Sequence, residues 1–153
     1  MIEIRPVTAA EFPDFEPLFV LYQQFYEVED IDRDRNRTFF SRFLVGPDGS
    51  GSADGWLLGA FDGSEPVGFG CFYRHRSSLS ATDIVLMNDL YVTEATRGKG
   101  TGRALIDAGV ELARGSGASH LSWATAPDNH TAQRLYDSTG AHKSTWLEYE
   151  IEV

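Results

Sequence analysis

Three glycines at alternate positions, Gly98, Gly100 and Gly102, stand between an apolar segment and an amphipathic one. Because glycine has no Cβ atom, successive backbone N–H groups in such a loop can crowd around one anion. The amphipathic segment predicts a helix that begins near Arg103, whose unpaired first-turn N–H groups and positive dipole end would point at the same place. The loop therefore predicts a site for a phosphate group.

Two common phosphate-binding loops do not fit the residues around these glycines. A Walker loop requires a hydroxyl residue directly after its lysine, but Lys99 is followed by Gly100. The dinucleotide fingerprint requires a third glycine where this chain has Leu105. The pattern that remains is Arg97-x-x-Gly100-x-Gly102. A glycine-rich turn that binds no ligand is the alternative.

A second segment could place polar groups along a ligand. Residues 129–136 read Asn-His-Thr-Ala-Gln-Arg-Leu-Tyr, and Gly140 follows. On a helix, Asn129, Ala132 and Tyr136 share one face. An amide, a small residue and a phenol in line along a helix suit a polar ligand that lies against it. The alternative is that Tyr136 only packs in the core.

These two segments together resemble the GNAT superfamily of acyl-CoA-dependent N-acyltransferases. The loop resembles the family's Arg/Gln-x-x-Gly-x-Gly/Ala pattern, and residues 129–136 resemble its Asn-x-x-Ala-x-x-Leu-Tyr helix. The resemblance implies acetyl-CoA as cosubstrate and direct attack of a neutral amine on the thioester within a ternary complex. We expect no metal, since the four histidines have no spacing to cysteine or carboxylate that is typical of a metal site.

The resemblance also assigns roles to residues. Tyr136 falls where the family has its general acid. For Asn129, a contact with the cofactor is implied, and a local capping role is the alternative. The pyrophosphate is expected on the loop backbone and the pantetheine arm beside the preceding strand, so the expected cofactor-binding residues are Leu90, Tyr91, Val92, Arg97, Gly98, Lys99, Gly100, Thr101, Gly102, Arg103, Asn129, Ala132 and Tyr136.

The group that deprotonates the acceptor amine is harder to assign. Polyamine-type members have a glutamate in the strand where this chain has Asn88, and an amide is a poor proton acceptor. Asp89 is the neighbouring carboxylate, but strand alternation predicts that it points to the opposite face from Asn88. A carboxylate bonded to the backbone is the alternative for Asp89. Transfer through water to Glu27 or Glu29, or arrival of a neutral amine, stays open.

The acceptor site is expected beside the connection between the first two helices, as in this family. Tyr22 and Tyr26 precede the acidic residues Glu27 and Glu29 there. Carboxylates next to aromatic rings suit an alkyl-ammonium ion or an extended polycation, and a solvated acidic loop is the alternative. We expect a small amine such as a polyamine or an aminoglycoside-like molecule. A protein lysine is the second choice, and a non-catalytic acyl-CoA-binding sensor is the rival.

Bulk properties narrow the class of protein. The chain has 153 residues, a net charge of −10 and one cysteine. The negative charge argues against binding of nucleic acid or of an anionic membrane surface. No apolar run approaches the roughly 20 residues of a membrane span. With one cysteine and no room for a signal peptide, we expect a cytoplasmic protein.

Apolar periodicity predicts one α/β domain over residues 1–153, in the order β-α-α-β-β-β-α-β-α-β. The GNAT resemblance implies the same plan, a mixed and mostly antiparallel twisted sheet flanked by helices. Thr8 and Glu11 form a capping-box sequence before the first helix. A homodimer is expected from the habit of the family, and the apolar last strand permits it. The expected strands are 2–6, 56–61, 66–75, 83–92, 120–125 and 143–153, and the expected helices are 14–26, 35–45, 103–114 and 129–136.

Overall fold

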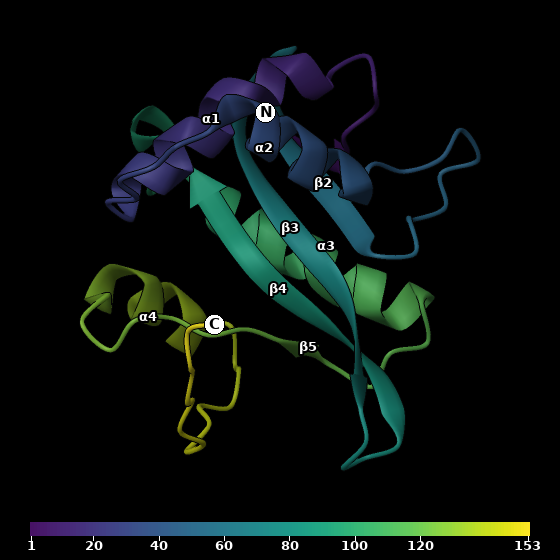
Figure 1. Cartoon of the computed structure of the whole chain (residues 1–153), viewed down its shortest axis with the longest axis vertical. Helices are drawn as coiled ribbons and strands as arrows, with labels where there is room; N and C mark the ends of the chain where they lie inside the picture. Colours follow the sequence, from purple (N-terminus) through teal and green to yellow (C-terminus); the bar gives the residue numbers. More distant parts are fainter.

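A computed structural model describes residues 1–153. Figure 1 shows a curled sheet with helices packed around it. Two short 3₁₀ helices, Ser41–Phe43 and Glu94–Thr96, connect the regular elements. Those elements are β1 (Ile2–Pro6), α1 (Phe12–Phe25), α2 (Arg33–Phe40), β2 (Gly55–Asp62), β3 (Glu65–Ser77), β4 (Thr82–Val92), α3 (Thr101–Gly115), β5 (Leu121–Ser122) and α4 (His130–Asp137).

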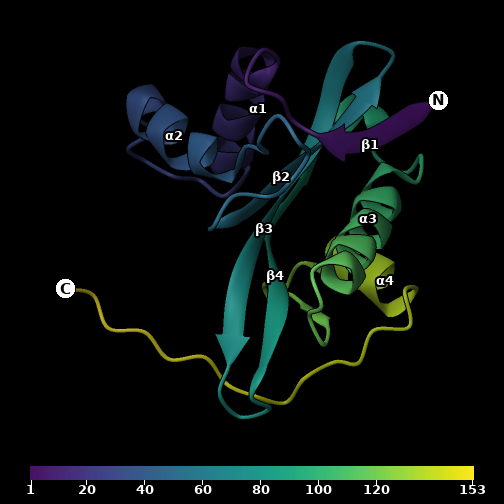
Figure 2. The same ribbon diagram turned by 90° about the vertical axis from the view of Figure 1, so that its right-hand side faces the viewer.

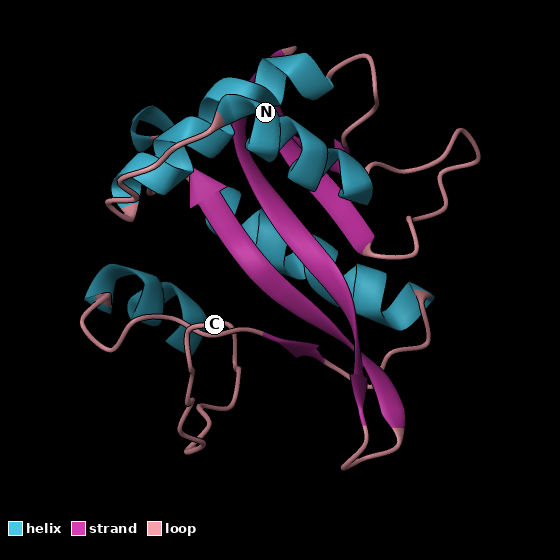
Figure 3. Cartoon of the chain, in the orientation of Figure 1, coloured by secondary structure: helices cyan, strands magenta, loops and turns pink.

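The five strands form one sheet in the order β1-β2-β3-β4-β5. The first four strands pair antiparallel, and β5 runs parallel to β4. Helices α1 and α2 cover one face of this sheet, while α3 and α4 lie on the other side (Figure 2). The structure therefore confirms the predicted fold class, a mixed and mostly antiparallel sheet flanked by helices (Figure 3). None of the helices combines the length and apolar character that crossing a bilayer requires.

The core forms two layers, one on each face of the sheet. Aromatic rings fill the layer under α1 and α2, where Phe19 stacks on Phe40 with ring centroids 3.9 Å apart. Mostly aliphatic side chains fill the layer under α3. Strand β2 is buried along nearly its whole length because helices cover both of its faces. This explains its continuous apolar sequence.

Helix α3 approaches the sheet most closely at Gly109. A Cβ atom at this position would lie 2.4 Å from the ring of Phe72, closer than two carbon atoms can pack. Glycine therefore lets α3 lie directly on β3. The contact fixes the position of the N-terminus of α3, and of the glycine loop before it, relative to the sheet.

The start of α1 follows the predicted capping box. The Thr8 N–H donates to Glu11 Oε2 at 3.1 Å, and the Glu11 N–H donates to Thr8 Oγ1 at 3.4 Å. The guanidinium of Arg5 also binds Glu11, and these hydrogen bonds lower the pKa of Glu11 to about 2. The cap fixes the direction of α1, and an ion pair between Arg37 and Glu16, 2.8 Å long, ties α2 to it.

Strand β4 contains a β-bulge at Asn88. Met87 lies opposite Phe72 and Asp89 lies opposite Cys71, so Asn88 is an extra residue with no register partner on β3. A bulge turns the side chains that follow it and bends the strand. The prediction that Asn88 and Asp89 point to opposite faces depends on regular alternation, which this bulge interrupts.

The predicted last strand does not form. Residues 141–153 belong to no helix or strand, and the segment extends away from the sheet past the turn between β3 and β4 (Figure 2). Strand β5 is also shorter than predicted, with two residues paired. A strand needs a neighbouring strand for its hydrogen bonds. Because β5 is so short, its outer edge offers few backbone groups to a last strand. The large apolar side chains of this segment are exposed, namely Trp146, Leu147, Tyr149, Ile151 and Val153.

Candidate active site

The glycine loop adopts a backbone conformation that favours glycine. Gly98 and Gly100 have φ angles of 75° and 86°, in the left-handed region that residues with a Cβ atom rarely adopt. A Cβ atom at either position would meet nothing within 4 Å. The loop therefore needs glycine for its conformation and has open space in front of it.

The backbone donors of this loop are free. No N–H group from residue 98 to residue 103 donates a hydrogen bond within the chain. Helix α3 begins at Thr101, two residues before the predicted start, and its N-cap residue Gly100 has no side chain to pair with these donors. Consecutive free N–H groups at a helix N-terminus favour binding of an anion.

The hydroxyl of Thr101 is a second polar group at the loop that lacks a hydrogen-bond partner. Thr101 is 2% exposed, and its Oγ1 is the one buried side-chain atom without a hydrogen bond. An unpaired buried hydroxyl costs about 1–3 kcal/mol. It lies at the first residue of α3, in the middle of the free N–H groups. The residues present therefore fit a phosphate-bearing ligand, whose oxygen atoms would pair with these donors.

Positive side chains surround the loop although the chain carries a net charge of −10. Arg97 donates from Nε to the Val92 carbonyl at 3.0 Å, and Arg103 pairs with Asp107 at 2.9 Å. Lys99 is exposed and has no carboxylate partner. Arg97 and Lys99 are therefore two cations of the loop that no carboxylate neutralises, and Lys99 makes no hydrogen bond within the chain.

The edge of β4 next to the loop lacks a strand neighbour. Strand β5 pairs with β4 only at Val85 and Leu86 and then diverges toward α4 (Figure 1). The predicted residues Leu90, Tyr91 and Val92 lie beyond these pairs. An extended ligand could therefore bind along this edge through backbone groups, as a strand would.

The predicted residues of α4 lie beyond this edge. Asn129 is the N-cap of α4, where its Oδ1 accepts a hydrogen bond from the Ala132 N–H at 3.1 Å. The capping role is thus confirmed, and the Nδ2 group of Asn129 has no partner in the chain. Tyr136 packs edge-on against Trp123 at 5.5 Å. Burial, and then the nearby Tyr26 phenol, raise the pKa of Tyr136 above its usual value of 10.

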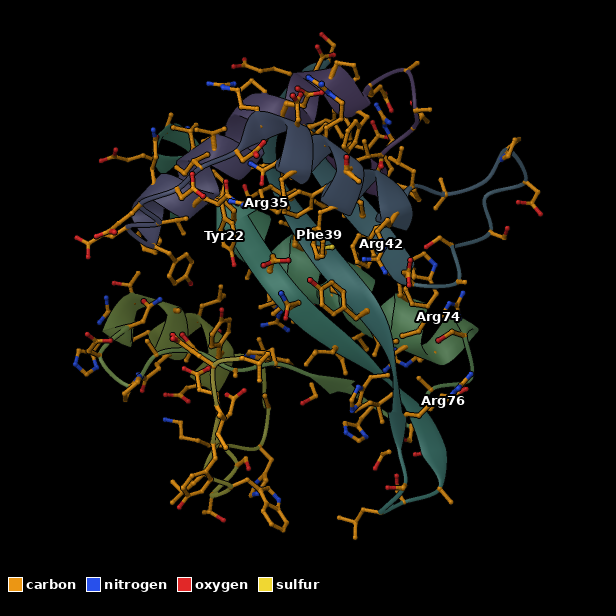
Figure 4. The ribbon with its side chains drawn as sticks, in the orientation of Figure 1. Tyr22, Arg35, Phe39, Arg42, Arg74 and Arg76 are labelled. Atoms are coloured by element: carbon orange, nitrogen blue, oxygen red, sulfur yellow. The ribbon has the colours of Figure 1, made fainter.

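A cavity of about 300 Å³ lies on the other side of β4, under α1 and α2. Figure 4 shows Tyr22, Arg35 and Phe39 at this junction between the helices and the sheet. The bulged segment of β4 lies at the same cavity. The lining residues are Tyr22, Gln23, Arg35, Asn36, Phe39, Phe40, Tyr73, Asn88 and Asp89.

Asp89 is the buried carboxylate of this cavity, with 6% of its surface exposed. Its Oδ1 accepts hydrogen bonds from the Tyr22 hydroxyl at 2.6 Å and from Asn88 Nδ2 at 3.2 Å. Its Oδ2 accepts no hydrogen bond from the chain and is not fully buried, which leaves this oxygen available in a residue that lines the cavity. Burial raises the pKa of Asp89 above its usual value, and the two hydrogen bonds partly oppose that shift.

These contacts correct two expectations for Asp89. Asn88 and Asp89 line the same cavity, because the bulge at Asn88 ends the alternation from which opposite faces were predicted. The hydrogen bonds of Asp89 also come from side chains and not from the backbone. The pKa of Tyr22 lies above its usual value because of burial and then the nearby Asp89 carboxylate.

The other residues predicted for the acceptor site are distributed differently. Tyr26 packs edge-on against Tyr22 with ring centroids 5.1 Å apart and is half-exposed. Glu27 and Glu29 are exposed, and neither lines the cavity. The acidic loop therefore lies outside the cavity lining, and Asp89 is the single carboxylate inside it.

Sequence reasoning missed several polar residues of the cavity. Gln23 and Asn36 form a reciprocal amide pair across α1 and α2, with N···O distances of 2.8 and 2.7 Å. Arg35 and Tyr73 complete the polar lining. The sequence held one signal, since Asn36 stands one helical turn before the apolar Phe40 and so lies on the same helix face. The structure shows both residues buried. A polar side chain on an apolar helix face requires a partner.

A family model described as "Acetyltransferase (GNAT) family" matches residues 15–141. This match covers most of the chain, so the protein belongs to the GNAT family of N-acetyltransferases, which are acyl-CoA-dependent enzymes. The D-amino-acid N-acetyltransferase HPA3 of Saccharomyces cerevisiae is 38% identical over 97 residues, which cover 62% of this chain and 60% of that relative. The uncharacterized N-acetyltransferase YhfO of Bacillus subtilis is 29% identical over 153 residues, which cover 99% and 98%.

Solved structures show the same fold. A probable acetyltransferase has a TM-score of 0.83 and 26% identity, covering 99% of this chain and 97% of its own. The aminoglycoside N-acetyltransferase AAC(6')-Iy in complex with CoA has a TM-score of 0.82 over 99% of this chain and 95% of its own, at 14% identity. The predicted family, fold class and enzyme class are thus confirmed.

Proposed function

We propose that this enzyme transfers the acetyl group of acetyl-CoA to the primary amine of a small molecule, by direct attack in a ternary complex. The observation that carries the proposal is the pair of sites on the two sides of β4. On one side, the N–H groups of residues 98–103 are free around the unpaired Thr101 hydroxyl. On the other side, Asp89 presents a free carboxylate oxygen in a cavity.

The loop, the β4 edge and α4 would hold acetyl-CoA. The free N–H groups and Lys99 would bind its phosphates. The backbone from Leu90 to Val92 would bind its pantetheine arm, and the Nδ2 group of Asn129 would donate a hydrogen bond to a further oxygen of the cofactor. Structures of GNAT neighbours with bound CoA support this cosubstrate. Bound acetyl-CoA supplies an electrophilic carbonyl and a thiolate leaving group.

Asp89 is proposed to receive the proton of the acceptor amine. An amine with a pKa of about 10 enters as an ammonium ion and must become neutral before it attacks. The Oδ2 atom of Asp89 is open, while Tyr22 and Asn88 hold Oδ1. Since burial raises the pKa of Asp89, its carboxylate is a stronger proton acceptor than an exposed aspartate. The C–N bond then forms as the C–S bond breaks.

Tyr136 is proposed to protonate the departing thiolate. Its raised pKa keeps the phenol protonated at neutral pH, and its hydroxyl has no acceptor in the chain. Its position on α4, across the open edge of β4, supports this role. One proton leaves the ammonium for Asp89 before attack. Tyr136 then gives its proton to sulfur as the C–S bond breaks, and the new amide nitrogen returns its second proton to the phenolate. Asp89 releases its proton to solvent between turnovers.

The cavity and the names of relatives support the proposal of a small amine as acceptor. Relatives are named for D-amino acids and for thialysine, and one structural neighbour was solved with an aminoglycoside analogue attached to CoA. A polyamine or an aminoglycoside-like cation is the class that the sequence predicts. Because Glu27 and Glu29 lie outside the cavity lining, Asp89 alone would bind its ammonium group there.

We also propose that the protein is a cytoplasmic homodimer. Within the exposed segment 143–153, residues 147–153 alternate between apolar and acidic as in a strand, but the segment finds no partner within its chain. Pairing with a second copy would cover it. Light scattering should give twice the monomer mass for the full chain and one monomer mass after truncation at residue 142. A monomeric full chain would refute the dimer. Buried, unpaired Cys71 fits a reducing compartment.

Thiol release from acetyl-CoA with a panel of amines tests the proposed activity. We expect turnover with at least one small primary amine, and calorimetry should detect binding of CoA to the protein alone. Absence of CoA binding would overturn the whole proposal. CoA binding without turnover on any amine would instead favour the acyl-CoA-binding sensor.

A further inference from the structure

The cavity under α1 and α2 contains two charged residues of opposite sign. Asp89 lies on the buried β4 side, and Arg35 comes from α2 with 61% of its side chain exposed. Every other lining residue is an aromatic or an amide. An extended polycation would therefore meet one carboxylate and one guanidinium, whose charges cancel. A molecule with both charges would match both groups.

Arg35 retains donors that no carboxylate of the chain satisfies. One Nη2 hydrogen bond goes to the carbonyl of Asp30 at 2.7 Å. The carboxylate of Asp30 is 3.6 Å away and 91% exposed, which makes a weak, solvent-screened pair. A guanidinium has five N–H donors, and Nε and Nη1 of Arg35 donate to no atom of the chain.

Neighbouring arginines differ from Arg35 in this respect. Arg37 donates from Nε and Nη2 to both carboxylate oxygens of Glu16, at 2.8 and 2.9 Å. Arg42 donates from Nε and Nη2 to both oxygens of Asp54, at 3.1 and 3.3 Å. Arg35 alone among these three lines the cavity and lacks such a two-point partner. The free edge of its guanidinium has the geometry that recognises a carboxylate.

We propose that the acceptor is an amino acid, whose carboxylate binds Arg35 while its amine faces Asp89. The inference rests on the proposed acetyltransferase function and narrows its acceptor. Phe39, Phe40 and Tyr73 line the same cavity and would pack against the carbon atoms of the acceptor. A volume of about 300 Å³ is at the small end for ligand sites, which suits a metabolite of this size.

Pairs of acceptors that differ only in the carboxylate test this inference. Lysine is compared with 1,5-diaminopentane and phenylalanine with phenethylamine, in both enantiomers of each amino acid. A third pair, 6-aminohexanoate and hexylamine, tests an acceptor whose amine and carboxylate are farther apart. A charge-assisted, two-point contact predicts that kcat/KM for the carboxylate-bearing member exceeds that of its partner by about 10- to 100-fold in at least one pair.

Substitution of Arg35 shows whether that preference comes from the guanidinium. Arg35→Gln should raise KM for the preferred amino acid and bring the ratio within the pair to about 1, because it removes the partner of the carboxylate and so lowers kcat/KM for the amino acid far more than for the plain amine. Arg33→Gln is the matched control, because Arg33 lies on the same helix outside the cavity lining. It should keep the wild-type ratio.

The outcomes separate this inference from the proposed activity. Turnover that favours the plain amine in every pair, or an equal loss for both members in Arg35→Gln, overturns the amino-acid inference and leaves the transferase intact. If no acceptor turns over, the transferase proposal fails. Calorimetry with the amino acids alone then tests the amino-acid site. Binding that Arg35→Gln abolishes supports the site, and absence of binding overturns it.

Discussion

The two sides of β4 are built in different ways. On the side of the glycine loop, the binding groups are backbone N–H donors whose positions follow from glycine conformation and the start of α3. On the cavity side, the binding groups are side chains from α1, α2 and β4 that a single bulge brings together. A site made of backbone depends on local sequence, whereas a site made of side chains depends on how distant segments pack.

The largest effect is expected on the cavity side, at Asp89. Asp89→Asn keeps the size of the side chain and an oxygen for the Tyr22 hydroxyl, but removes the proton acceptor. We expect kcat/KM to fall about 10³-fold, as for loss of a general base, with CoA affinity unchanged. Steady-state kinetics and calorimetry measure the two quantities. A loss of less than threefold would exclude Asp89 as the base.

The next effect is expected on the cofactor side, at Tyr136. Tyr136→Phe removes the proton donor and retains the ring that packs against Trp123. We expect kcat to fall about 10²-fold with little change in KM for acetyl-CoA. Activity should partly recover with thioesters whose leaving thiol has a lower pKa, because these need less protonation. An unchanged kcat would remove Tyr136 from the reaction.

Backbone conformation of the loop should affect the cofactor alone. Gly100→Ala forces a Cβ atom into a left-handed conformation and should weaken CoA binding about 10-fold, since it disturbs the N–H donors. Gly63→Ala is the matched control, because Gly63 has φ of 63° and an open Cβ position in the turn between β2 and β3. Both variants should lose about 1 kcal/mol of stability. Equal CoA affinity in the two variants would contradict the role of the loop.

Burial of Asp89 also predicts how stability depends on pH. Its folded pKa is raised, so the folded state holds this proton more tightly than the unfolded state does. The stabilising contribution is complete below the unfolded pKa of about 3.9 and is lost as the pH rises through the folded pKa. Asp89→Asn should therefore melt at a higher temperature than wild type at pH 7, and this advantage should shrink as the pH falls. Calorimetric scans across pH test the sign, and a lower melting temperature at pH 7 would contradict it.

The smallest effect is expected at Thr101. Thr101→Val removes the unpaired hydroxyl and keeps the branched shape. The ligand-free protein should gain about 1 kcal/mol of stability, and its melting temperature should rise by about 2–4 °C. The additional stabilisation by CoA should decrease in the same variant. A lower melting temperature of the ligand-free valine variant would contradict the assignment of an unpaired hydroxyl to Thr101.

The fold and the loop could largely be predicted from sequence because their signals are local. The loop of Gly98 and Gly100 leads into a helix as predicted, and the capping box at Thr8 and Glu11 forms as expected. These features depend on residues a few positions apart. Hydrophobic periodicity likewise predicted most of the helices and strands.

The acceptor side could be predicted only in part. Asp89 was a candidate, but its direction depends on the bulge at Asn88, which strict alternation does not anticipate. Arg35 was missed because its position at the cavity depends on how α2 packs on α1 and the sheet. The prediction of the last strand was wrong. An alternating pattern indicates that a segment could pair as a strand, but it does not indicate which sheet edge is available to it.

The contact between Gly109 and Phe72 connects the two sides of β4. Phe72 lies under α3 and is also paired with Met87, the residue directly before the bulge. The ring of Phe72 therefore supports the helix that would receive the phosphates, while the backbone of the same residue pairs next to the bulge that brings Asp89 to the cavity. Any side chain at position 109 would push this ring and misalign donor and acceptor molecules together, although residue 109 would touch neither of them.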